Sequence, residues 1–340
     1  MMKRRKTVSL PVVAALAAVL SLAGCGGRER ADVELLNVSY DPTREFYLEF
    51  NRAFSEHYQG KTNRTSLIRQ SHGGSSRQAR YVIDGAPADV VTLALAYDID
   101  AIAEAGFLPR DWQRRLPYNS APYHSTLAFL VRKGNPAGIR DWDDLARPGV
   151  SVITPNPKTS GVARWNYLAA WGWAEQRFEG DEAEVIGYIT RLYRNVPVLD
   201  TGARGATTTF MERGIGDVLV NWENELLLAL QRRGDDFEIV IPSISIRAEP
   251  TVALVDRNVD RRGTRETAQA YLEYLYSETG QRLAGKHFFR PSDPRYLEEF
   301  RDQYPEVPMF TIDEVFGGWT PATEKHFRDG GIFDQIYLVK

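Results

Sequence analysis

Short apolar runs alternate with amphipathic stretches along most of the chain. Residues 33–40 have the composition of a strand, and Phe46, Phe50 and Phe54 then recur at the spacing of one helix face. The same pattern predicts further strands at 65–70, 88–96, 126–131, 151–153, 196–199, 217–220, 237–241 and 251–255, with helices after most of them. Strands that alternate with helices form mostly parallel sheets covered on both faces. The sequence therefore predicts an α/β fold.

The junctions between strand and helix share a chemical character. Ser160 and Gly161 open a predicted helix, and such a turn presents free backbone N–H groups and the positive end of the helix dipole. Comparable turns are Asp41-Pro42, Gly73-Gly74-Ser75, Gly202-Ala203-Arg204-Gly205 and Asn221-Trp222. In open α/β sheets, turns of this kind gather at the carboxyl ends of the strands, where ligands bind. They offer almost only neutral donors, which suits a small oxyanion.

Two charged residues complicate this prediction. The carboxylate of Asp41 would repel an anion, and we expect it to cap a helix while its backbone N–H stays available to the ligand. Arg204 could pair with the anion or neutralise a neighbouring carboxylate, and the sequence leaves both roles open.

The first residues predict export. Residues 3–6 are all basic, and the uncharged run 7–24 has about the length of a signal-peptide core, shorter than the roughly 20 residues of a membrane-spanning helix. The run ends in Leu22-Ala-Gly-Cys25, which resembles a bacterial lipobox with Cys25 as the lipid-modified residue. The alternative is an ordinary cleavage site that contains a cysteine. Cys25 is the single cysteine, so an internal disulfide is excluded.

Charge and residue spacing argue against several functions. Loss of residues 1–24 removes four positive charges and takes the formal net charge from −3 to −7, so binding to nucleic acid is not expected. The five histidines have no metal-site spacing, and no Gly-x-Ser-x-Gly motif indicates a hydrolase. We therefore expect neither an enzyme nor a metal or cofactor site.

Several motifs resemble those of the periplasmic sulfate-binding proteins of ABC importers. They are Leu35-Leu-Asn-Val-Ser-Tyr-Asp-Pro-Thr-Arg44, Gln70-Ser-His-Gly-Gly-Ser75, Val152-Ile-Thr-Pro-Asn-Pro-Lys158, and the segments 163–172, 202–205, 214–218 and 310–319. The resemblance runs from about Val33 to the C-terminus. It implies a monomeric, periplasmic protein of the two-lobed type II architecture, which closes on one sulfate and delivers it to the membrane subunits of an ABC permease.

The resemblance also implies a domain division and a ligand set. We expect a signal peptide at 1–24, a linker at 25–32, one lobe from 33–115 plus 248–340, and a second lobe from 116–247. The family's sulfate contacts fall on the backbone of Asp41, the hydroxyls of Ser75 and Ser160, the backbone of Gly161, Val162 and Ala203, and the indole of Trp222. Val162 departs from the family, which usually has a second glycine at this position, but the main-chain donor is retained.

A site made of donors alone would select among anions. Sulfate is a dianion that only accepts hydrogen bonds, whereas phosphate near neutral pH carries a proton that needs an acceptor. Leaving that proton unpaired costs roughly 1 to 3 kcal/mol. The alternatives are thiosulfate, then another oxyanion such as molybdate, and finally an envelope protein that binds no small solute.

Overall fold

The computed structural model describes residues 31–338. The predicted signal peptide and Cys25 lie outside the described residues, as does most of the linker. No helix among those described is both long enough and apolar enough to cross a membrane.

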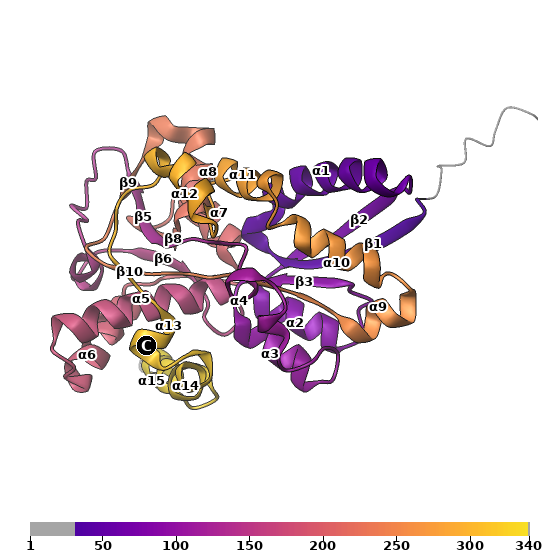
Figure 1. Ribbon diagram of the computed structural model, residues 1–340. Helices are drawn as coiled ribbons and strands as arrows, with labels where there is room; N and C mark the ends of the chain where they lie inside the picture. Colours follow the sequence, from indigo (N-terminus) through magenta and orange to yellow (C-terminus); the bar gives the residue numbers. More distant parts are fainter. Residues whose placement is uncertain (1–30, 339–340) are drawn as a thin grey trace, which may run out of the picture.

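A four-stranded sheet forms the centre of one lobe, which we call the first lobe (Figure 1). Its strands, in spatial order, are β11 (Thr251–Leu254), β3 (Val90–Leu93), β1 (Val33–Tyr40) and β2 (Ser66–Gly73). β1 is parallel to both neighbours, and β11 joins the edge antiparallel to β3. Its helices are α1 (Arg44–Thr62), α2 (Ser75–Ile83), α3 (Ala96–Glu104), α9 (Asp256–Arg262), α10 (Arg265–Tyr274) and α11 (Glu278–Lys286). Figure 1 shows α1 and α10 on one side of the sheet and α2 and α3 on the other.

A five-stranded sheet organises the second lobe. Its spatial order is β7 (Leu199–Asp200), β6 (Val152–Pro155), β8 (Val218–Trp222), β5 (Leu127–Arg132) and β9 (Phe237–Val240). β6 is parallel to β7 and β8, whereas β5 is antiparallel to β8 and β9, so this sheet is also mixed. Its helices are α5 (Gly161–Arg177) and α6 (Glu182–Arg194) on one face, and α7 (Ala203–Met211) and α8 (Glu223–Arg233) on the other (Figure 1). The predicted α/β class is confirmed.

Two adjacent segments carry the chain between the lobes. Ser125 and Ala248 exchange two backbone hydrogen bonds, each 2.9 Å long, so the outgoing and returning segments run side by side. The short strands here are β4 (Tyr123–His124) with β12 (Arg290–Pro291), and β10 (Ser245–Ile246) with β13 (Met309–Phe310). The remaining short elements are η1 (Asp41–Thr43), η2 (Trp112–Arg114), α4 (Pro117–Ser120), η3 (Trp142–Ala146), η4 (Gly234–Asp236), α12 (Pro294–Glu299) and η5 (Arg301–Gln303).

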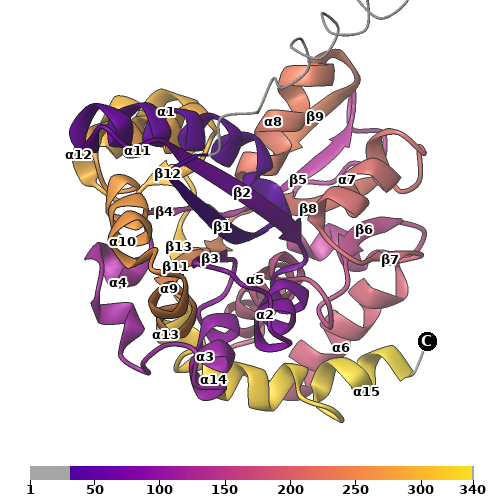
Figure 2. The same cartoon turned by 90° about the vertical axis from the view of Figure 1, so that its right-hand side faces the viewer.

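The C-terminal segment lies across both lobes. It consists of α13 (Ile312–Phe316), α14 (Trp319–Ala322), the π-helix η6 (Thr323–Phe327) and α15 (Ile332–Leu338). Figure 2 shows α14 near α3 and α15 near α6. Trp319 packs edge to face on Trp165 of α5, and Phe333 on Tyr193 of α6. The segment, expected as part of the first lobe, is thus also attached to the second, and the predicted lobe boundaries stay a prediction.

Candidate functional site

A small cavity lies where the two lobes meet. The first lobe lines it with Tyr40, Asp41, Pro42, Gly73, Gly74, Ser75 and Ala94, and the second with Ser160, Gly161, Val162 and Ala203. The empty space, including its opening to solvent, is about 170 Å³, so the cavity is small. Six of the seven residues predicted as ligand contacts therefore line one cavity, and they come from both lobes.

Helices begin at four of these residues. Asp41 starts η1, which leads into α1, and Ser75, Gly161 and Ala203 start α2, α5 and α7. The first N–H groups of a helix have no acceptor within that helix and carry the positive end of its dipole. Four such ends at one cavity make a site for an anion without requiring a basic side chain.

The hydroxyls of Ser160 and Ser75, both predicted ligand contacts, make different hydrogen bonds. Ser160 is the N-cap of α5, and its Oγ accepts from the N–H of Ala163 at 3.4 Å, which leaves the hydroxyl proton available. The Oγ of Ser75 accepts from the N–H of Ala94 at 3.0 Å and donates its proton to Oδ2 of Asp98 at 2.5 Å. In this arrangement the donor that Ser75 offers the cavity is its backbone N–H, in place of the hydroxyl that we expected.

Asp98 holds Ser75 from behind the cavity wall. Its side chain is buried, and burial raises the pKa of its carboxyl, an effect opposed by the nearby Arg164 and by the hydrogen bond from Ser75. Arg164 belongs to α5 of the second lobe, so Asp98 also links the two lobes electrostatically. Asp98 was not recognisable from the sequence, because its partner Ser75 lies 23 residues away on another helix.

Trp222 lies beside the cavity, outside its wall. It ends β8, is fully buried, and packs edge to face on Tyr40 with 5.5 Å between ring centroids. Its indole Nε1–H has no hydrogen-bond partner among residues 31–338. A buried donor without an acceptor is unfavourable and rare. An anion next to Tyr40 and Trp222 would supply the missing acceptor.

Tyr40 itself was missed by the sequence analysis. Its side chain is buried at the cavity, and its hydroxyl also has no partner within the described part of the chain. Burial is the main reason why the pKa of this phenol lies well above its ordinary value, so the hydroxyl keeps its proton. The available signal was its position, directly before Asp41 at the carboxyl end of a predicted strand.

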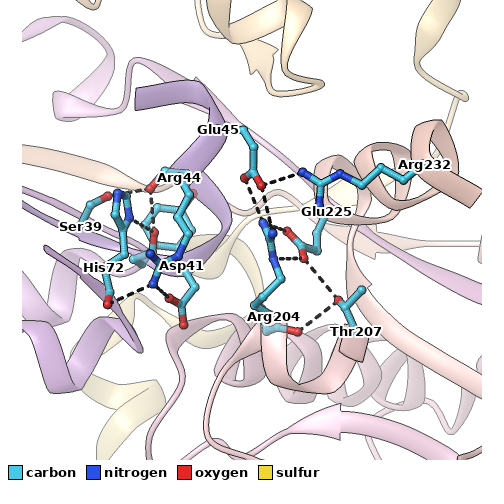
Figure 3. A network of polar contacts seen from close by, with 12 residues as sticks. Ser39, Asp41, Arg44, Glu45, His72, Arg204, Thr207, Glu225 and Arg232 are labelled. Carbon is cyan, nitrogen blue, oxygen red and sulfur yellow. Dashed lines mark hydrogen bonds and ion pairs between the residues drawn. The ribbon is translucent and has the colours of Figure 1, made fainter. Parts of the chain in front are cut away.

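The prediction that Asp41 caps a helix with its carboxylate is wrong. The side chain makes no capping hydrogen bond, and Oδ1 accepts instead from Nη2 of Arg44 at 3.0 Å (Figure 3). Arg44 also donates to the carbonyl of His72, whose ring contacts the carbonyl of Tyr40. The negative charge of Asp41 is thus compensated within the first lobe, and its main-chain N–H at the cavity is unaffected.

Arg204 is occupied by carboxylates. Nη1 and Nη2 donate to the two carboxylate oxygens of Glu45 at 3.0 Å, and Nε lies 2.8 Å from Oε1 of Glu225 (Figure 3). Arg232 of α8 pairs with Glu45 as well, at 2.8 Å. Partial burial alone would raise the pKa of Glu45, but the hydrogen bonds from Arg204 and Arg232 outweigh it and lower that pKa to about 2. Of the two roles left open for Arg204, the structure favours neutralisation of a carboxylate.

Metal ligands are not clustered in the described part of the chain. Within residues 31–338, no group of three or more His, Cys, Asp or Glu side chains is arranged to hold an ion. The residues that line the cavity also include no Lys or Arg. An anion there would be held by dipoles and hydrogen bonds.

Two α/β lobes joined by adjacent crossing segments, with an anion-suited cavity between them, define the two-lobed, type II class of periplasmic-binding proteins. The chain belongs to the family of bacterial extracellular solute-binding proteins, which it matches over residues 35–290.

Three relatives illustrate the range of similarity. The chain is 60% identical to a sulfate-binding protein of Escherichia coli K12 over 306 residues, 90% of this chain and 93% of the relative. It is 49% identical over 338 residues, 99% of both chains, to a thiosulfate-binding protein of Pseudomonas aeruginosa. The solved structure of the sulfate-binding protein SubI from Mycobacterium tuberculosis H37Rv aligns with a TM-score of 0.79 at 33% identity, covering 87% of this chain and 99% of that one.

Proposed function

We propose that the protein binds sulfate between its lobes and delivers it to the membrane subunits of an ABC import permease. The observation that carries this proposal is the convergence of four helix N-termini on one small cavity, beside a buried indole N–H that lacks an acceptor. Both features call for a ligand that is an anion and an acceptor. The relatives at 60% identity are named sulfate-binding proteins, which supports sulfate as that anion.

Seven donors would hold the dianion. Five are the backbone N–H groups of Asp41, Ser75, Gly161, Val162 and Ala203, and the others are the hydroxyl of Ser160 and the indole N–H of Trp222. These groups are neutral, so the charge of sulfate is spread over dipoles fixed by the fold. Closure of the lobes brings the two halves of this set together.

Selectivity against phosphate follows from the same set. The carboxylate of Asp41 is the one charged acceptor on a residue lining the cavity, and it already accepts from Arg44. The proton of a phosphate would find no free carboxylate on the residues that line the cavity, which disfavours phosphate relative to sulfate.

Thiosulfate is the second candidate. The relative that spans 99% of this chain is named a thiosulfate-binding protein. The terminal sulfur of thiosulfate is larger than oxygen and accepts hydrogen bonds weakly. A site made of N–H and O–H donors therefore favours sulfate. Isothermal titration with sulfate, thiosulfate, molybdate and phosphate tests this order of affinities. We expect sulfate to bind tightly and phosphate not to bind; no heat with sulfate, or equal affinities for sulfate and phosphate, would refute the proposal.

The proposal includes the protein's setting. We infer that it works in the periplasm as a monomer without catalytic activity, that residues 1–24 are its signal peptide, and that Cys25 carries a lipid anchor. We also keep the division into lobes at 33–115 plus 248–340 and 116–247, with the segment from Ile312 contacting both. Mass spectrometry of the mature N-terminus tests the anchor, since an unmodified start near Gly26 would exclude it.

A further inference from the structure

Three glycines lie where one lobe touches the other around the cavity. A Cβ added at Gly74 would overlap the carbonyl oxygen of Thr159 in the second lobe. At Gly161, an added Cβ would lie 2.9 Å from Cβ of Ser75 and 3.0 Å from Cβ of Ala94, both in the first lobe. Real Cβ atoms do not approach other heavy atoms so closely, so a side chain at either position would force groups of the two lobes to shift.

The third contact, at Gly202, involves a movable side chain. At Gly202 of the second lobe, an added Cβ would lie 2.9 Å from Oδ2 of Asp41 in the first lobe. The atom it meets is the end of a side chain, which can rotate, whereas the carbonyl of Thr159 belongs to the backbone. The three positions therefore differ in how firmly they resist a side chain, with Gly74 firmest and Gly202 most tolerant.

Backbone conformation does not explain these glycines. Gly74 has φ −61° and ψ 136°, and Gly202 has φ −163° and ψ 169°, both open to any residue. Neither has the positive φ for which glycine is usually required. The close approach of the opposite lobe disfavours a side chain at both positions, strongly at Gly74 and less at Gly202.

The neighbouring Gly73 provides an internal contrast. An added Cβ there would meet only the side chain of Gln78, 3.1 Å away on the same lobe. The two residues are adjacent in one turn and both line the cavity, yet only Gly74 faces a backbone atom of the other lobe.

We propose that Gly74, Gly161 and Gly202 determine the size selectivity of the site by setting how far the lobes close. Each touches the opposite lobe next to a donor: Gly74 precedes Ser75, Gly161 precedes Val162 and Gly202 precedes Ala203. Gly74 and Gly161 contact rigid groups of the opposite lobe, so the lobes can close only to one separation. That separation fixes the distance between the donors of the first lobe and those of the second. A tetrahedral anion of sulfate size then reaches both sets, whereas a larger one keeps the lobes apart. This inference rests on the proposed function.

The test compares Gly74→Ala with Gly60→Ala, a change in α1 where an added Cβ meets no atom within 4 Å, by titration with sulfate and with molybdate, a tetrahedral anion with longer bonds to oxygen. Gly74→Ala should weaken sulfate binding about tenfold or more, since overpacking a rigid contact is costly. Binding of molybdate should weaken less, so the ratio of the two affinities falls. Gly60→Ala should stay within about twofold of the unmodified protein. Gly202→Ala, which meets a movable side chain, should fall between them.

Small-angle scattering with saturating sulfate supplies an independent measurement. The Gly74→Ala protein should keep a larger radius of gyration than the unmodified protein, while the two agree without anion. Unchanged sulfate affinity in Gly74→Ala, or an equal loss for sulfate and molybdate, would overturn the inference. Circular dichroism checks that Gly74→Ala folds. If it does not fold, the test relies on Gly202→Ala, and an unchanged ratio of sulfate to molybdate affinity in that variant would contradict the inference. Failure of the unmodified protein to bind sulfate would instead refute the proposed function.

Discussion

Arg204 of α7 and Glu45 of α1 form a two-point ion pair across the boundary of the lobes, with both N–O distances at 3.0 Å. Arg204 directly follows Ala203, one of the proposed sulfate donors, so the pair holds the first turn of α7 against the first lobe. Arg232 adds a second link from α8 to the same carboxylate (Figure 3). The pair therefore stabilises the arrangement in which the proposed donors of the two lobes lie at one cavity.

Replacing Glu45 by Gln should weaken sulfate binding. The change removes a charge that accepts from two arginines, and hydrogen bonds to charged groups contribute about 1.5 to 3 kcal/mol. Because part of this stabilisation also depends on Glu225, which stays in place, we expect a loss of roughly tenfold in affinity, measured by titration calorimetry.

Two neighbouring arginines provide the matched control for this change. Arg232→Gln should reduce affinity less than Glu45→Gln, because Arg232 is more exposed than Arg204 and exposed pairs contribute little. Arg233 pairs with Asp236 within the second lobe, so Arg233→Gln should leave affinity unchanged. Equal effects of the Arg232 and Arg233 changes would contradict a role for the Glu45 cluster in closure.

Ser160 and Ser75 should respond differently to loss of the hydroxyl. Ser160→Ala removes a proposed sulfate donor and should cost about 1 to 3 kcal/mol of binding free energy. Ser75→Ala keeps the backbone N–H but leaves buried Asp98 without its hydroxyl partner, so it should lower thermal stability more than affinity. Titration and thermal melting of both variants check this, and an affinity loss in Ser75→Ala as large as in Ser160→Ala would show that both hydroxyls contact the ligand.

Trp222→Phe should separate binding from packing. The substitution keeps a buried aromatic ring beside Tyr40 but removes an indole N–H that has no partner among the described residues. We expect sulfate affinity to fall by about 1 to 2 kcal/mol. The melting temperature without anion should fall little, because no internal hydrogen bond is lost. A large fall in the melting temperature without anion, combined with unchanged sulfate affinity, would show that Trp222 contributes to packing and does not contact the ligand.

His326 should make the stability of the C-terminal segment depend on pH. It packs on Trp171 with 4.4 Å between ring centroids, and burial, assisted by Lys325, lowers its pKa from 6.5 to about 3. Between these values the unfolded chain binds a proton that the folded chain does not, so stability falls as pH falls from 6.5 toward 3. The loss should be on the order of 1 to 3 kcal/mol between pH 6.5 and 4.5.

Thermal melting across that pH range checks the His326 prediction. His326→Gln should flatten the dependence of the melting temperature on pH, because the amide does not titrate. His57 is exposed, and partial burial lowers its pKa to a smaller extent, so His57→Gln should change the slope less than His326→Gln does. Parallel curves for His326→Gln and the unmodified protein would exclude His326 as the source.

Local patterns allowed much of the fold to be predicted. The strand at 33–40 and the helix through Phe46 and Phe54 follow from residue periodicity, and the structure places β1 and α1 there. The strand predicted at 196–199 was less accurate, because β7 spans only Leu199–Asp200 and pairs through Thr154 and Pro155 of a distant strand. The orientation of β5 against β8 is likewise a matter of pairing between segments far apart in the chain.

The sequence by itself determined the kind of ligand that the protein suits. Glycines and small polar residues at the ends of strands specify helix N-termini, and these local features are enough to predict neutral donors and an anion. Tertiary structure decided which atoms are left for the ligand. The hydroxyl of Ser75 is taken by Asp98, Arg204 by Glu45 and Glu225, and the indole of Trp222 is left without a partner. Those outcomes depend on hydrogen bonds and ion pairs between residues remote in sequence, whose meeting is set by how the two lobes pack.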